Sequence, residues 1–500
     1  MSDLALPVST PVAPVEDAAP TAQTHRWWIL GVVGLAQLMV VLDATIVNIA
    51  LPSAQMDLGF SNADRQWIVT AYSLSFGALL LLGGRLSDLV GRKRMLLIGL
   101  IGFATFSAIG GAANGFAVLV IGRAFQGAFG AMLAPAALST LAVTFPDPGE
   151  RGRAFGVYGA IAGAGGAVGL LLGGVLTQFL SWRWCLYVNV VLALVAVAGA
   201  LTFLRSQSRD PTVRLDPPGT ILVVAGLASL VYGLSEAETK GWGAPLTIGL
   251  LVAAAVLLTA FVLVEQRVEH PLLPLRIVLD RFRGGSYLAI GLSAIGLFGV
   301  FLFLTYYLQL ILGYSPVRTG VAFLPLIAAL MVTSTTSSGI LLPRMGPRPL
   351  IPLGLFVSAG GMVVLTQIGV HSSYVSPILP GLVLVGLGLG LVFGCGFNTA
   401  TYGATAADAG VASAMVNTNQ QIGGAIGTAL LNTIAASALS SYLVVHGNSP
   451  QALADGSVHS YIVAFTVSAI IFAGAGIVCG LVLPTGVLKP STADNIPAVA

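Results

Sequence analysis

One acidic side chain lies deep within an apolar stretch of this sequence. Residues 27–52 read WWILGVVGLAQLMVVLDATIVNIALP, with Asp43 near the middle. A helix of about 20 apolar residues, rising about 1.5 Å per residue, crosses roughly 30 Å of hydrocarbon. An ionised carboxylate there costs at least about 2.5 kcal/mol, so such groups usually face a water-filled cavity, a partner charge or a proton path. Asp43 is therefore a candidate for proton exchange within a membrane span.

One basic residue is available as a partner for that acid. Arg123 also lies within a predicted span. The same helix face carries an amide and two small residues at i+3, i+4 and i+7, namely Gln126, Gly127 and Gly130. A buried guanidinium must be paired or hydrated, and Asp43 is the only deep acid available to it. Arg123 therefore either shares in the chemistry of Asp43 or forms a static structural pair.

A charged, glycine-containing loop follows the second apolar run. Residues 84–94 read GRLSDLVGRKR, and the candidate gating residues in them are Gly84, Asp88, Gly91 and Arg92. The glycines let two helix ends approach closely, and the Asp88 carboxylate could accept hydrogen bonds at the positive N-terminus of a facing helix. The alternative is a solvated loop that only sets topology, which explains the basic residues but not an acid between two glycines.

Amides and hydroxyls recur within apolar runs near the C-terminal end. One helical face carries Asn417, Gln420, Gln421, Gly424 and Thr428. Polar groups in lipid serve either as interhelical hydrogen bonds or as the wall of a cavity, and five small or polar groups on one stripe favour the cavity. The full set of residues predicted to line it is Gln126, Thr305, Tyr306, Gln309, Asn398, Asn417, Gln420 and Gln421.

The composition is that of a membrane protein. The chain has 500 residues, of which 56% are hydrophobic and only 8% charged, whereas a soluble protein needs about 25% charge. The net charge of +3 comes from short basic groups between apolar runs, so it reflects membrane topology and not nucleic-acid binding. The cysteines lack metal-binding spacing, and the histidines fall in tails or loops. Neither HExxH nor a P-loop is present.

Hydropathy divides the chain into fourteen predicted membrane spans. They cover residues 27–50, 65–83, 95–113, 117–145, 154–179, 185–204, 218–235, 245–264, 285–311, 319–342, 350–370, 376–402, 411–440 and 461–483. A cytoplasmic N-terminus leaves most Lys and Arg residues on the inner side, in agreement with the positive-inside rule. We therefore expect an all-α polytopic membrane protein with both termini in the cytoplasm.

Two charged linkers bracket spans seven and eight, which predicts six spans, an inserted pair and six more. An internal repeat supports this division: GRLSDLVGRK at residues 84–93 aligns with GILLPRMGPR at residues 339–348, with Pro343 in place of Asp88. The predicted parts are a disordered cytoplasmic tail at 1–26, an N-terminal six-helix bundle at 27–204, a linker with two inserted helices at 205–284, a C-terminal six-helix bundle at 285–484 and a cytoplasmic tail at 485–500.

Taken together, these motifs resemble the major facilitator superfamily, and within it the fourteen-helix drug:proton antiporter family. The resemblance covers about residues 27–484. Residues 84–94 match the loop signature GxLaDrxGrkxxl, which is highly specific. Further matches are RAFQGAFG at 123–130 to the fourth-helix motif RxxqGxg, LDATIVNIALP at 42–52 to the first-helix motif, and WRW at 182–184, PLLPLR at 271–276 and NTNQQIGG at 417–424.

The resemblance implies roles for several residues. It implies that the loop with Asp88 latches the cytoplasmic side and that Arg123 takes part in proton coupling. Residues 165–174, GGAVGLLLGG, resemble the fifth-helix antiporter motif gxxxGPxxGG and add the gating candidates Gly165, Gly169, Gly173 and Gly174. Leu170 stands where the family usually has proline, which predicts that this helix lacks a kink. The glycines could equally form a plain packing ribbon for a neighbouring helix.

The function implied is proton-coupled export of lipophilic drugs or antibiotics by alternating-access antiport. Asp43 would exchange one proton per cycle for a small neutral or cationic substrate. We expect a multi-pass protein of the cell membrane that works as a monomer, with no cofactor and no nucleic-acid partner. The alternatives are proton-linked symport or export of an endogenous metabolite or lipid and, less favoured, a membrane enzyme or sensor.

Overall fold

The computed structural model describes residues 25–60, 62–205, 214–404 and 408–488. Most of the two predicted terminal tails, and residues 206–213 of the predicted linker, lie outside these ranges. The described part is helical apart from one isolated β-bridge between Ser373 and Pro377. The prediction of an all-α protein is confirmed.

The helices follow one another with short connections. They are α1 (Arg26–Leu58), α2 (Asn62–Val90), α3 (Arg92–Gly111), α4 (Phe116–Thr144), α5 (Pro148–Phe179), α6 (Trp184–Phe203), α7 (Pro217–Lys240), α8 (Pro245–Glu265), α9 (Leu275–Leu279), α10 (Arg281–Tyr306), α11 (Pro316–Ala322), α12 (Leu324–Thr336), α13 (Leu342–Met345), α14 (Pro347–Leu365), α15 (Ile378–Ala400), α16 (Ala409–His446) and α17 (Pro450–Val482). Two π-helical turns, η2 (Tyr307–Ile311) and η3 (Ser337–Leu341), extend α10 and α12.

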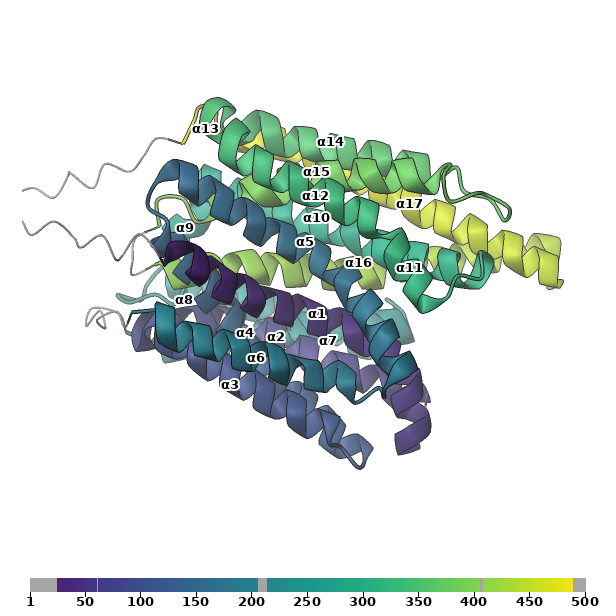
Figure 1. The fold of residues 1–500 in the computed structure, drawn as a ribbon, viewed down its shortest axis with the longest axis horizontal. Coiled ribbons are helices and arrows are strands. Elements are labelled where there is room, and N and C mark those ends of the chain that lie inside the picture. The colour runs from purple at the N-terminus through teal and green to yellow at the C-terminus, as the bar shows by residue number, and fades with distance from the viewer. Residues whose placement is uncertain (1–24, 61, 206–213, 405–407, 489–500) are drawn as a thin grey trace, which may run out of the picture.

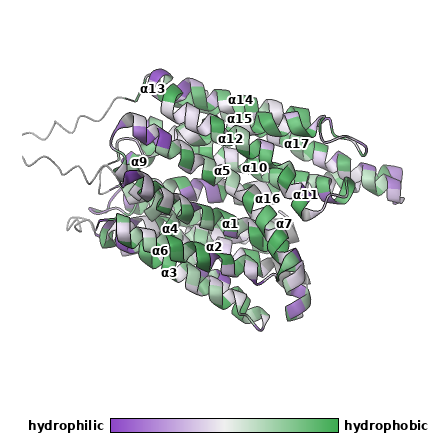
Figure 2. Cartoon of the chain, in the orientation of Figure 1, coloured by the Kyte–Doolittle hydropathy of each residue, from purple (hydrophilic) through white to green (hydrophobic). Residues whose placement is uncertain are grey.

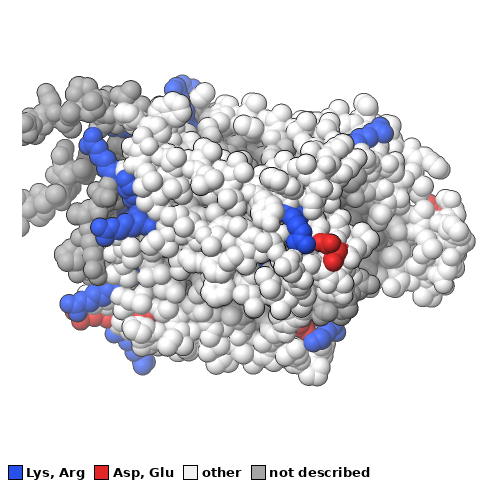
Figure 3. All heavy atoms as spheres, turned by 60° about the horizontal axis from the view of Figure 1, so that its bottom comes forward, with Lys and Arg blue, Asp and Glu red and all other residues white. Residues whose placement is uncertain are grey.

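Thirteen helices in the described residues are long and apolar enough to cross a membrane, and the number is fourteen if the two bent segments of α5 count as one span. Each of the fourteen predicted spans overlaps one of them. The helices are hydrophobic along most of their length, with hydrophilic residues gathered toward their ends (Figure 2). Lys and Arg gather at the left end of the molecule in Figure 3, and a broad uncharged surface lies beside them on that face. We call this end the arginine-rich end.

Helix α5 bends sharply, so the expectation of an unkinked helix is wrong. The segments Gly149–Gly166 and Leu171–Phe179 differ in direction by 47°. Sharp bends form at glycine pairs as well as at proline, and Gly165 and Gly166 come directly before the change of direction. The substitution of leucine for the motif proline at position 170 therefore does not keep α5 straight.

The helices pack in two groups with a hairpin beside them (Figure 1). Helices α1 to α6 form one set, in which α5 packs on α1 and also extensively on α12 and α15, and helices α10, α12 and α14 to α17 form a second set that packs mainly on itself. Helix α7 packs on α8 and lies against α2 and α16, so the α7–α8 hairpin touches both groups. We call the first set the N-group and the second the C-group.

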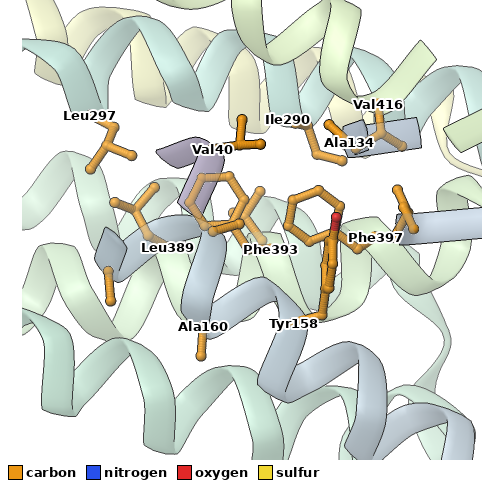
Figure 4. Packing of buried hydrophobic residues seen from close by; sticks show 14 of the residues in the cluster. Val40, Ala134, Tyr158, Ala160, Ile290, Leu297, Leu389, Phe393, Phe397 and Val416 are labelled. Carbon is orange, nitrogen blue, oxygen red and sulfur yellow. The ribbon is translucent and has the colours of Figure 1, made fainter. Parts of the chain in front are cut away.

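An apolar, aromatic core joins the two groups. Figure 4 shows Tyr158 of α5 beside Phe393 and Phe397 of α15, with Val40 of α1 and Ile290 of α10 close by. The rings of Tyr158 and Phe397 meet edge to face at 5.8 Å between centroids, a favoured aromatic geometry. This core buries apolar side chains of both groups against one another.

Candidate functional site

Asp43 lies at the centre of a buried polar network built from α1, α3, α4 and α6. Its Oδ2 accepts a hydrogen bond from Arg123 Nη1 at 2.5 Å. Its Oδ1 accepts from Gln126 Nε2 and from Asn189 Nδ2, both at 2.8 Å. The same two amides donate to Ser107 Oγ at 3.0 and 3.1 Å. The carboxylate therefore has three donors, one of which is charged.

Arg123 is held by more than this ion pair. Its Nη1 also donates to Gln126 Oε1 at 2.8 Å, and its Nε donates to the carbonyl oxygen of Ile68 at 3.4 Å. The guanidinium carbon lies 4.2 Å from the ring centroid of Tyr72, within the range of a cation–π contact. The expected pairing of Arg123 with Asp43 is present, and the plane of the guanidinium is fixed from several sides.

The network is closed to solvent in this conformation. Asp43 and Gln126 have 0% of their surface exposed, and Arg123 has 1%. All of its residues come from the N-group. Proton exchange at Asp43 therefore requires a movement of α1, α4 or α6 that admits water.

The glycines of α5 pack against the part of α1 that carries Asp43. A Cβ added at Gly165, Gly169 or Gly173 would come within 3.0 Å of a side chain of α1. The shortest of these distances would be 2.0 Å, between a Cβ at Gly169 and Oγ1 of Thr45, which lies two residues after Asp43. These glycines are therefore a close-packing surface for the part of α1 that carries the acid. Their role in gating stays a prediction.

Sequence reasoning missed three members of the network. Ser107, Asn189 and Tyr72 lie within apolar spans and belong to no motif that we identified. The signal that could have found Asn189 is its amide in the middle of a very apolar helix, since such groups need a partner in lipid. Neither its Oδ1 nor the Tyr72 hydroxyl has a hydrogen-bond partner among the described residues.

The first polar contact between the two groups is made by Asp88. Its Oδ1 accepts a hydrogen bond from the backbone N–H of Gly410, in the first turn of α16, at 3.0 Å. Gly84 packs at the same place: a Cβ there would come 2.6 Å from the carbonyl oxygen of Gly410. Two residues before Gly410, Asp408 forms an ion pair with Arg276 at 2.8 Å. Asp88 thus accepts at a helix N-terminus, as the sequence predicted.

A second contact joins the first turns of α5 to the C-group. Arg151 Nε donates to Asn398 Oδ1 at 3.2 Å, and its Nη2 donates to the carbonyl oxygen and Oγ1 of Thr401 at 3.2 and 3.1 Å. Ser334 Oγ donates to the carbonyl oxygen of Gly156 at 2.7 Å. The groups are therefore in polar contact on two sides of the arginine-rich end. We call the two sets of contacts the Asp88 latch and the Arg151 latch.

The two copies of the internal repeat take similar backbone conformations. Gly91, at φ 98°, and Gly346, at φ 75°, take the same kind of left-handed backbone conformation immediately before α3 and α14. At the start of each repeat, Gly84 packs against α16 and Gly339 against α5. Arg92, the first residue of α3, is buried beside the first of these turns. The repeat therefore places equivalent glycines in two equivalent contacts between the groups.

Two residues predicted to line a cavity lie elsewhere in this conformation. Gln126 belongs to the Asp43 network, and Asn398 belongs to the Arg151 latch, where it also donates to Ser338 Oγ at 3.4 Å. Both are buried. Their amides are occupied by protein partners, so neither offers a free group to a ligand in this state.

The other predicted cavity residues differ in their burial and in their hydrogen-bond partners. Asn417 is buried and donates to the backbone of its own helix, whereas Gln420 and Gln421 are half-buried. Thr305 is buried, and its Oγ1 has no hydrogen-bond partner among the described residues. Tyr306 is 42% exposed. Of the remaining predicted residues, Gln309 is half-buried and Gly174 is buried in α5.

Gly84→Ala is expected to open the Asp88 latch. The new Cβ would lie 2.6 Å from both the carbonyl oxygen of Gly410 and the Cβ of Ala414, so α2 and α16 must separate. Overpacking of this kind costs about 1–3 kcal/mol. We expect hydrogen exchange at the first turn of α16 to rise at least about fivefold, the equivalent of about 1 kcal/mol, as measured by mass spectrometry.

Gly360→Ala is the matched control, since a Cβ at that helical position would meet nothing within 4 Å. Hydrogen exchange at the first turn of α16 in Gly360→Ala should equal that of the unsubstituted chain. Equal exchange in the two glycine variants would show that the packing of Gly84 does not hold the latch closed.

Comparison with known proteins agrees with this architecture. The family model described as "Major Facilitator Superfamily" matches residues 33–428. The puromycin resistance protein pur8 of Streptomyces alboniger is 53% identical over 454 residues, which cover 90% of each chain. The cephamycin export protein CmcT of Amycolatopsis lactamdurans is 40% identical over 408 residues, 81% of this chain and 84% of that one.

Solved structures support the fold. The proton:xylose symporter XylE superposes with a TM-score of 0.63 at 15% identity, over 94% of this chain and 98% of its own. The human organic anion transporter MFSD10 superposes with a TM-score of 0.61 at 16% identity, over 91% of this chain and 99% of its own. At this identity the likeness concerns the fold alone. The family model and the relatives above show that the chain belongs to the major facilitator superfamily of membrane transporters, and that it is not an enzyme.

Proposed function

We propose that this chain is a proton-driven antiporter of the cell membrane that exports lipophilic antibiotics or related drugs. The observation that carries the proposal is the closed network in which one carboxylate, Asp43, is neutralised by one guanidinium, Arg123. The names of the relatives support the cargo class, since they specify resistance to puromycin and export of cephamycin. The proton gradient would drive the cycle without a cofactor, and one chain would suffice.

The proposed layout is six spans, an inserted pair and six more, with both termini in the cytoplasm. The N-group would be the bundle at 27–204, the α7–α8 hairpin the insert within 205–284, and the C-group the bundle at 285–484. The gathering of Lys and Arg at one end supports the orientation through the positive-inside rule. Both latches would then lie on the cytoplasmic side, and this conformation would be closed to the cytoplasm.

The proton would act on the substrate path through helix movement. Protonation of Asp43 removes the charge that holds Arg123, so the ion pair weakens and α1 and α4 can separate. The tight glycine contact between α5 and α1 would pass this movement on to the Arg151 latch at the other end of α5. In the alternative, drug and proton would compete for one site. The separation of Asp43 from the C-group favours coupling through conformation in place of direct competition.

The energetics of this exchange suit one proton per cycle. A membrane potential of 100 mV contributes about 2.3 kcal/mol per charge, and one pH unit contributes about 1.4 kcal/mol. Their sum supports roughly a 500-fold gradient of a neutral drug. For a monovalent cation the exchange moves no net charge, so only the pH gradient drives it.

The substrate would lie between the groups, against apolar side chains with a few polar ones. The predicted cavity residues that keep an exposed surface or an unpartnered group are Gln420 and Gln421 of α16, Thr305 and Tyr306 of α10 and Gln309 of η2. Such a sparse set of polar groups favours amphipathic organic molecules over sugars or ions. The cavity proposed here therefore lies on the C-group side, apart from the Asp43 network.

Transport in vesicles tests the proposal. The purified chain is reconstituted into liposomes, a pH gradient is imposed, and the flux of radiolabelled puromycin is measured. We expect puromycin to move against the proton flux and to stop when a protonophore collapses the gradient. Movement in the same direction as the protons would instead show symport, and a flux indifferent to the gradient would overturn proton coupling altogether.

A further inference from the structure

A basic pocket lies at the arginine-rich end, enclosed by the N-group alone. It has a volume of about 380 Å³ and is lined by residues of α1, α3, α4 and α6 and of the segment after α6. The Asp43 network and the two latches share none of its lining apart from Arg92. No step of the proposed transport cycle uses this space, so its chemistry needs its own account.

Four basic side chains line the pocket, namely Arg26, Arg92, Lys93 and Arg205, with His25 beside them. Only part of this charge is balanced. Arg26 pairs with Glu150 at 3.0 Å, and Arg92 interacts with the charge of Asp88. Lys93 Nζ donates to the carbonyl oxygens of Leu201 and Leu204 at the end of α6, which are not charged. Counted over the residues that the structure describes, the pocket keeps an excess of positive charge.

The backbone adds to this charge. Arg92 and Lys93 are the first two residues of α3, whose N-terminus has no side-chain cap. The positive end of the helix dipole therefore lies in the same wall as two basic side chains. Guanidinium and ammonium groups around such a terminus are well suited to an anion with several oxygens, above all a phosphate.

One wall of the pocket is apolar and continues onto the outer surface of the helices. Phe203 and Ile29 line it, and Trp28, 63% exposed, stacks on Phe203 at 5.7 Å between centroids. Trp27 is 45% exposed in the same first turn of α1. Tryptophans at the end of a span lie at the level of lipid headgroups. The pocket is therefore at the depth where a phospholipid presents its phosphate.

We propose that this pocket binds the headgroup phosphate of an anionic phospholipid, with the acyl chains leaving along the apolar wall beside Trp28. Basic pockets between membrane helices recognise such headgroups in this way. The volume accommodates a phosphate with a glycerol. A soluble phosphate would gain nothing from the tryptophans or from Phe203, so the observations favour the lipid as occupant.

Binding is measured on the full chain purified in a neutral maltoside detergent, by native mass spectrometry and by thermal shift. The probes are dioctanoyl phosphatidylglycerol, dioctanoyl phosphatidylcholine and inorganic phosphate. The variants are Arg205→Gln and Lys93→Gln, with Arg94→Gln as matched control, because Arg94 is exposed on the same turn of α3 and does not line the pocket. The assay does not depend on transport, so its result is independent of the proposed function.

We expect phosphatidylglycerol to bind at least tenfold more tightly than phosphatidylcholine. Arg205→Gln and Lys93→Gln should each weaken its binding at least fivefold, and Arg94→Gln less than twofold. Lys93 also bonds to α6, so Arg205→Gln with unchanged helix content is the decisive variant. Equal binding of the two lipids, an equal loss in Arg94→Gln, or inorganic phosphate binding as tightly as the lipid would each overturn the proposal.

Discussion

Asp43→Asn is expected to reduce proton-driven export at least 100-fold. An amide has almost the shape of the carboxylate and can still accept from Gln126 and Asn189, which donate to it at 2.8 Å. It can neither take up nor release a proton at physiological pH. The measurement is puromycin flux in proteoliposomes under an imposed pH gradient, compared with passive exchange in the absence of a gradient.

The same substitution is expected to destabilise the folded chain. It leaves the Arg123 guanidinium, 1% exposed, without its counter-charge. Removing one partner of a buried ion pair costs about 3–5 kcal/mol. A loss of transport alone would therefore not separate a role in coupling from a role in folding. The double variant Asp43→Asn, Arg123→Gln removes both charges, so it should recover most of the thermal stability but none of the coupling.

Asp57→Asn is the matched control on the same helix. Asp57 also pairs with an arginine, Arg183, at 2.8 Å, but 48% of the Asp57 side chain is exposed. Exposed pairs contribute about 0–1 kcal/mol, so this variant should keep transport within twofold. Gradient-driven export at the unsubstituted rate in folded Asp43→Asn protein would refute the assignment of Asp43.

The parts of the fold that could be predicted are those that lipid fixes strongly. A charge within an apolar run is so costly that Asp43 and Arg123 could be paired from the sequence alone, and the structure shows that pair. The repeat could be predicted because both of its second glycines, Gly91 and Gly346, are needed at a left-handed turn. Hydropathy located all the spans for the same reason, since the length of each is set by the bilayer.

The partners of the uncharged amides could not be predicted. A helical pattern gives the face on which a side chain lies but not the helix that stands opposite. Gln126 and Asn398 were therefore assigned to one cavity, although the first meets Asp43 and the second meets Arg151 of the other group. The bend of α5 was missed for a related reason: the expectation considered the absent proline and not the adjacent pair Gly165 and Gly166.

The Asp43 network and the Arg151 latch lie in different parts of the molecule, and α5 connects them. Its first turns carry Arg151, and its glycines pack on the segment of α1 around Asp43. A change at the acid that alters the spacing of α1 and α5 must therefore alter the position of a helix that holds the groups together. This makes the geometry of the ion pair, and not only its charge, important for coupling.

Arg123→Lys tests that distinction and is expected to reduce coupled transport at least tenfold. The substitution keeps the positive charge, so Asp43 retains a counter-charge. An ammonium cannot at once bond to Asp43, Gln126 and the carbonyl of Ile68 and lie flat over Tyr72, as the guanidinium does. We expect the variant to fold, with a smaller loss of stability than Asp43→Asn, and to transport poorly under a pH gradient.

Arg183→Lys provides the control, because Arg183 also forms an ion pair, with Asp57 at 2.8 Å, but is only partly buried and lies outside the Asp43 network. Its transport should stay within twofold of the unsubstituted chain. If Arg123→Lys transported equally well, a positive charge near Asp43 would suffice, and the fixed plane of the guanidinium would have no part in coupling. A loss confined to Arg123→Lys would instead show that proton exchange depends on how the arginine is held.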